Sequence, residues 1–199
     1  MKKHLVTQFA SAITLAILSA GSALAASEGR SEALVIEPRI SANREELAPS
    51  FGIYGGAASQ NGDGYRTDPS FMLDFAIQPF IPFSFALQAQ YAPSSLNVPF
   101  AKIDFNTSNL LLKEVLNFGG TIPVLRNSYV GTKIGATMYT GDIDTKTHLS
   151  AGPTLGFDIP LSPANNVSLG AEATYLAVLG DDLATPDQTS LLGAVKYWF

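Results

Sequence analysis

His148 and Ser150 are the residues of this chain whose types and spacing come closest to covalent catalysis. A serine hydroxyl becomes a nucleophile when a histidine takes its proton and a carboxylate orients the imidazole. Side chains two apart in a strand share a face, so this pair would point one way and Leu149 the other. If Leu149 lies on the outer face of the fold, the pair faces inward, out of reach of a substrate at the outer surface. We therefore expect no catalytic residues, and a hydrolase using His148 and Ser150 is the alternative hypothesis.

Five charged residues fall on the polar faces of segments that alternate with a period of two. Counted from the nearest turns, Asp74, Lys113, Lys133 and Glu172 reach similar heights, and Lys196 lies lower. Inside a closed sheet opposite charges should pair, because an unpaired buried charge costs far more than the pair gains. The pattern predicts a lumen charge belt that stabilises the fold. A gated ion path is the functional alternative.

Two short segments, 61–64 and 141–144, resemble fragments of calcium loops. Neither supplies the run of oxygen ligands and the distal bidentate acid that such a loop needs. Asn-Gly and Asp-Gly pairs are favoured at hairpin tips, so we interpret these segments as tight turns. The chain has no cysteine, which excludes disulfides and thiol chemistry. We expect neither a metal site nor a cofactor.

The elements that must position these residues are strands. Phe71, Leu73 and Phe75 share one face, while Met72 and Asp74 share the other. Ile-Pro dipeptides recur roughly every 40 residues, the length of a hairpin with two membrane-crossing strands. Four such hairpins predict an all-β fold, an eight-stranded antiparallel up-and-down transmembrane β-barrel. Its lumen is about wide enough to be filled by side chains, which argues against a general porin.

Segment 106–118 fits the alternation less well. Its leucines make an outward face that would also direct Glu114 into lipid, where a charge is costly. A bulge at Lys113 and Glu114 would turn both charges inward. A short helix over 110–117 is the competing interpretation.

The connecting segments indicate an orientation. Both ends of the barrel lie on the side of the Ile-Pro turns, which is periplasmic in an exported barrel. The opposite connections collect most of the aspartates and should face outside. These predicted outer loops are 59–70, 92–105, 141–147 and 180–189.

The amino terminus predicts export. A basic start, an apolar stretch and Ala23-Leu24-Ala25 are typical of a secretory signal peptide over 1–25. Residues 26–49 are expected to be a polar periplasmic extension and 50–199 the barrel. The whole chain carries 17 acidic and 12 basic residues, which argues against nucleic-acid binding. The predicted location is the cell outer membrane.

Residues 50–199 resemble the small eight-stranded outer-membrane barrels of the OmpA-transmembrane-domain and OmpX type, in alternating faces, hairpin number and terminal strand. In that family a terminal aromatic residue, preceded by alternating apolar residues, is what the outer-membrane assembly machinery reads. Val195, Tyr197 and Phe199 occupy those places. The resemblance implies a monomer that contacts outer-membrane lipid, lipopolysaccharide and the assembly machinery.

Two further resemblances supply the alternatives. His148-Leu149-Ser150 is similar to the His-x-Ser of the outer-membrane lipid A deacylases, which are also eight-stranded. Barrels of the OmpW type suggest a carrier of small hydrophobic molecules, which would need an apolar inner cavity. We expect a barrel that is not an enzyme and has a structural or narrow ligand or solute role.

Overall fold

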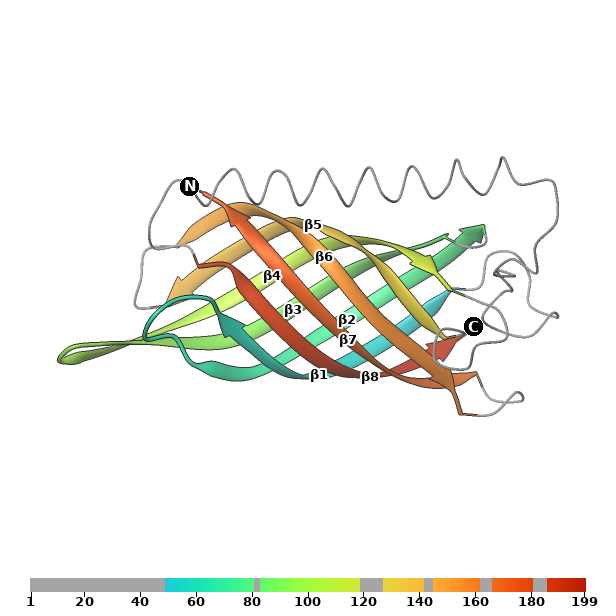
Figure 1. Cartoon of the computed structure of the whole chain (residues 1–199), viewed down its shortest axis with the longest axis horizontal. Helices are drawn as coiled ribbons and strands as arrows, with labels where there is room; N and C mark the ends of the chain where they lie inside the picture. Colours follow the sequence, from blue (N-terminus) through green and yellow to red (C-terminus); the bar gives the residue numbers. More distant parts are fainter. Residues whose placement is uncertain (1–48, 81–82, 119–126, 142–144, 162–165, 181–185) are drawn as a thin grey trace, which may run out of the picture. The chain divides into compact units, whose positions relative to one another are not determined.

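Eight antiparallel strands form one closed barrel in the computed structural model, which describes residues 49–80, 83–118, 127–141, 145–161, 166–180 and 186–199. Each strand pairs with its neighbours in sequence, and the first pairs with the last (Figure 1). The strands are β1 (Ser50–Gln60), β2 (Thr67–Phe80), β3 (Phe83–Val98), β4 (Ala101–Asn117), β5 (Ser128–Gly141), β6 (Lys146–Pro160), β7 (Val167–Leu179) and β8 (Gln188–Trp198). The predicted fold class is confirmed. The predicted signal peptide and all of the predicted extension except Pro49 lie outside the described residues.

The alternation of side chains separates the lumen from the outer surface. On β2, Leu73 is 50% exposed, whereas the adjacent Met72 is 1% exposed. On β3 the same contrast separates Leu87 from Gln88. Because successive side chains of a strand point to opposite faces, closing the sheet buries one set and exposes the other. No helix of the described residues is long and apolar enough to cross a membrane.

β4 passes through Lys113 and Glu114 without a bulge. Its register with β3 and β5 is unbroken there, with Glu114 opposite Phe85 and Thr132. Lys113 is buried in the lumen, and Glu114 is exposed on the outer face. The predicted bulge and the alternative helix are both wrong. Glu114 lies three residues before Asn117, the end of the strand, and near an interface a charge on the lipid face costs little, so nothing forces a bulge.

β3 and β4 extend as a hairpin well beyond the other strands (Figure 1). Their pairing continues to Val98 opposite Ala101, so the predicted loop 92–105 is almost entirely strand, and that prediction is wrong. β3 pairs with β2 only as far as Tyr91. Pro93 therefore lies in a strand with one free edge, where a proline is tolerated, although its presence suggested a loop.

Candidate functional site in the barrel lumen

The lumen charge cluster consists of six buried side chains contributed by six strands. Three are acids and three are lysines, so their formal charges cancel, and each is at most 5% exposed. Within the described residues these are the charged side chains buried in the barrel: Asp74, Lys113, Lys133, Asp158, Glu172 and Lys196.

Lys113 joins the two acids at the centre of the cluster. Its Nζ lies 3.1 Å from Oδ2 of Asp74 and 3.0 Å from Oε2 of Glu172. Lys133 Nζ donates to the other carboxylate oxygen of Glu172, Oε1, at 2.6 Å. Glu172 therefore binds two ammonium groups at once, and such saturation is what makes a buried ion pair tolerable.

Neutral side chains add hydrogen bonds to the two acids. Gln88 Nε2 donates to Asp74 Oδ2 at 2.7 Å, and Tyr129 Oη donates to Glu172 Oε2 at 2.7 Å. The ammonium of Lys113 also lies 5.2 Å from the centre of the Tyr129 ring, within the range of a cation–π contact. The cluster is thus a connected network and not a set of isolated pairs.

A separate ion pair, between Lys196 and Asp158, lies beside the contacts that Lys113 and Lys133 make with Glu172. Lys196 Nζ donates to Asp158 Oδ2 at 2.9 Å and lies 5.5 Å from the centre of the Tyr54 ring. A side chain at Gly52 would bring a Cβ to 2.9 Å from Tyr54 Cε2 and 3.0 Å from Lys196 Cγ. Glycine at this position makes room for both large side chains in the lumen.

The structure gathers all five residues of the predicted belt and decides which of them pair. Asp74 contacts Lys113 and not Lys133, which binds Glu172. Asp158 was not in the predicted belt, although its inward position on β6 was a usable signal. Gln88 and Tyr129 were also missed, because neutral side chains do not stand out in a search for charges.

A layer of amides and hydroxyls lies on the side of the charge cluster away from the chain ends. Asn109 Nδ2 donates to Gln188 Oε1 at 2.7 Å and to Gln90 Oε1 at 3.2 Å. Its own carbonyl oxygen accepts a bond of 2.7 Å from Thr137 Oγ1. These residues come from four strands, so the hydrogen bonds cross the lumen and fill it.

An aromatic cluster lies beyond the amide layer and consists of Tyr65, Leu96, Phe105, Tyr139 and Val178. The ring centres of Phe105 and Tyr139 are 6.1 Å apart, and those of Phe105 and Tyr65 are 6.2 Å apart. Desolvation raises the pKa of the Tyr65 hydroxyl above its usual value. The cluster places apolar side chains at the end of the lumen away from the chain ends.

His148 and Ser150 face the lumen, as the alternation predicts. The Ser150 hydroxyl is fully buried and lies within hydrogen-bond distance of Thr137 Oγ1, at 2.8 Å, and of the Gly135 carbonyl, at 3.5 Å. The His148 ring lies against Tyr139, with 6.3 Å between centres. Thus Ser150 is bonded to groups other than His148. Among the described residues, no group of three or more histidine, aspartate or glutamate side chains is placed to hold a metal ion.

Three large side chains at the end of the chain point outward. Val195, Tyr197 and Phe199 are all exposed, and the Tyr197 and Phe199 rings make an edge-on contact with centres 5.3 Å apart. The Phe199 N–H donates to the Pro49 carbonyl at 3.0 Å. Both ends of the described chain therefore meet at one end of the barrel.

Two solved structures share the architecture of this chain. Ail, the attachment invasion locus protein of Yersinia pestis, in complex with the heparin analogue sucrose octasulfate, is 14% identical, with a TM-score of 0.52; the match covers 78% of this chain and 100% of Ail. Neisserial surface protein A is 15% identical, with a TM-score of 0.58, over 78% of this chain and 98% of that chain. No protein-family model and no curated protein sequence matches. The chain has the fold of the small eight-stranded outer-membrane β-barrels.

Proposed function

We propose that the protein is an integral outer-membrane β-barrel with a side-chain-filled lumen, that its role is structural or a narrow ligand or solute role, and that it is not an enzyme. The observation that carries the proposal is the neutral, fully paired charge cluster in the lumen. A carrier of small hydrophobic molecules would need a continuous apolar path through the lumen, whereas the charge cluster and the amide layer cross it. A general porin would need an open path.

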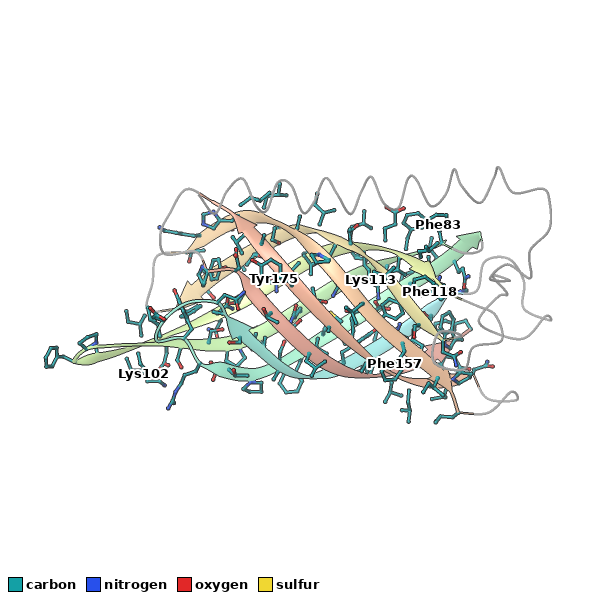
Figure 2. The ribbon with its side chains drawn as sticks, viewed as in Figure 1. Phe83, Lys102, Lys113, Phe118, Phe157 and Tyr175 are labelled. Carbon is teal, nitrogen blue, oxygen red and sulfur yellow. The ribbon has the colours of Figure 1, made fainter. Side chains whose placement is uncertain are left out.

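The outer surface supports a membrane location. Large apolar side chains are exposed on all eight strands, including Ile53, Leu73, Leu110, Ile134 and Leu155. An apolar band of this extent is unfavourable in water and favourable in lipid. Phe83, Phe118 and Phe157 gather at the end of the barrel opposite Lys102 (Figure 2), as expected for an aromatic girdle at one membrane interface. This end carries the termini, and we assign it to the periplasm, after export with residues 1–25 as signal peptide.

A conductance measurement tests the sealed lumen. In planar bilayers the wild-type barrel is expected to show at most small, rare steps. Tyr129→Ala removes a ring that lies between Lys113 and Lys196, so larger and more frequent steps are expected. Tyr91→Ala removes a ring from the outer face and should leave the conductance unchanged. Large, steady conductance in the wild type would contradict the proposal.

A lipid analysis tests the absence of enzyme activity. His148→Ala and Ser150→Ala are expected to leave the lipid A acylation pattern of the cell unchanged, because both side chains face the lumen. The measurement is mass spectrometry of lipid A with and without overexpressed protein. Loss of an acyl chain that depends on both residues would instead identify a hydrolase.

A further inference from the structure

The tip of the β3–β4 hairpin has an unfavourable backbone conformation. Two residues, Pro99 and Phe100, connect the strands, and Phe100 has a φ of 76°. Proline followed by a residue with positive φ is the pattern of a type II turn, whose second central position is normally glycine or asparagine. A bulky L-residue is strained there. Of the described non-glycine residues, Phe100 is the one with positive φ.

The Phe100 side chain gains nothing from the barrel in return. It is 107% exposed, the largest value among the exposed large apolar residues described. It lies within the apolar sequence Val98-Pro99-Phe100-Ala101. Strain and exposure are both unfavourable for the free protein, which indicates that this side chain is used outside the barrel.

The hairpin beneath the tip is braced. The segment between β1 and β2 folds against β3, where Tyr65 pairs with Leu96. Asn97 N donates to the Gly64 carbonyl at 2.9 Å, and Arg66 N donates to the Ser95 carbonyl at 3.3 Å. These contacts support the hairpin that carries Phe100.

The tip of the hairpin lies too far from the barrel's own bilayer to contact it. Tyr91 is an exposed aromatic on β3 and donates from its hydroxyl to Asn106, as expected at an outer membrane interface. Phe100 lies nine residues further, or about 30 Å along the strand. With a tilt of roughly 40° the tip stands on the order of 20 Å above the outer interface. The partner of Phe100 is thus not the lipid around the barrel.

We propose that the tip inserts Phe100 into the interfacial region of an apposed lipid bilayer. A convex two-residue tip cannot supply the roughly 800 Å² per partner of a stable protein interface, whereas a bilayer accepts a wedge without matched shape. The ion pair of Lys102 and Asp104, 2.7 Å long and exposed, begins two residues behind Phe100, about 7 Å along the strand. Insertion would stop where these charges reach the headgroups, a depth typical of interfacial anchors. The proposal rests on the outward orientation assigned above.

Fluorescence of the barrel in nanodiscs, mixed with phosphatidylcholine–phosphatidylglycerol vesicles, tests the insertion. Trp198 is the single tryptophan, so the difference between Phe100→Trp and the wild type isolates the tip. A blue shift of the added emission and its quenching by brominated vesicle lipid are expected. If adding these vesicles, which contain lipid alone, leaves the emission added by Phe100→Trp unchanged, the proposal is overturned.

Vesicle cosedimentation separates binding from folding. Phe100→Gly relieves the backbone strain, so the barrel should be at least as resistant to urea as the wild type, while its vesicle-bound fraction falls about tenfold as the apolar area is lost. Leu161→Ser removes an exposed apolar side chain at the opposite end and should leave binding unchanged. Equal binding by Phe100→Gly and the wild type would overturn the proposal.

Labelling of intact cells separates this proposal from the assigned orientation. The chain has no cysteine, so Ala101→Cys should react uniquely with a membrane-impermeant maleimide. Leu161→Cys should react only after the outer membrane is permeabilised. The reverse pattern would overturn the orientation, and with it an outward tip, even if the tip bound vesicles in nanodiscs.

Discussion

Replacing Phe199 with lysine, or deleting it, is expected to leave the protein in the periplasm as unfolded, degraded chain, with outer-membrane levels reduced to a small fraction. Phe199 directly follows β8, the strand that closes the barrel against β1, and it is exposed beside Tyr197. A strand that fails to dock leaves an open edge, which lipid does not tolerate. Immunoblots of fractionated membranes and heat-modifiable gel mobility measure the outcome.

Phe157→Lys is the matched control for that change. Phe157 is an exposed aromatic at the same end of the barrel (Figure 2), but it lies on the internal strand β6. A lysine near an interface costs little, so this variant should assemble. Normal outer-membrane levels of Phe199→Lys would show that the terminal aromatic is not read as an assembly signal.

Replacing Lys113 with methionine is expected to lower the free energy of unfolding by about 3–5 kcal/mol if the lumen is dry. Lys113 is the ammonium group that bridges Asp74 and Glu172. Methionine keeps much of the bulk and leaves Asp74 without its cation. The urea midpoint of the folded barrel reports the loss.

Two further variants distinguish pairing from packing. Lys113→Met combined with Asp74→Asn restores neutrality in the lumen and should recover part of the lost stability. Lys102→Met breaks an exposed pair with Asp104 and should change stability by less than about 1 kcal/mol. An unchanged urea midpoint in Lys113→Met would mean that water reaches the cluster and screens it.

Local pattern was sufficient to predict much of the fold and the inward set of side chains. A period of two places Leu73 outside and Asp74 inside whatever the neighbouring strands do, because the rule acts within one strand. Because the pattern repeats in segments of hairpin length, it also predicts the number of strands. The same rule placed His148 and Ser150 on the lumen side.

Only the tertiary structure decided which charges pair and where the strands end. The strands of a closed barrel are tilted and staggered. Heights counted along each strand from its turn therefore do not show which residues of non-neighbouring strands come into contact. Lys113 on β4 thus reaches both Asp74 on β2 and Glu172 on β7. The long β3–β4 hairpin was equally hidden, since Pro93 is compatible with a loop or with a strand that has a free edge. Local rules determine faces, whereas contacts across the lumen depend on the geometry of the closed sheet.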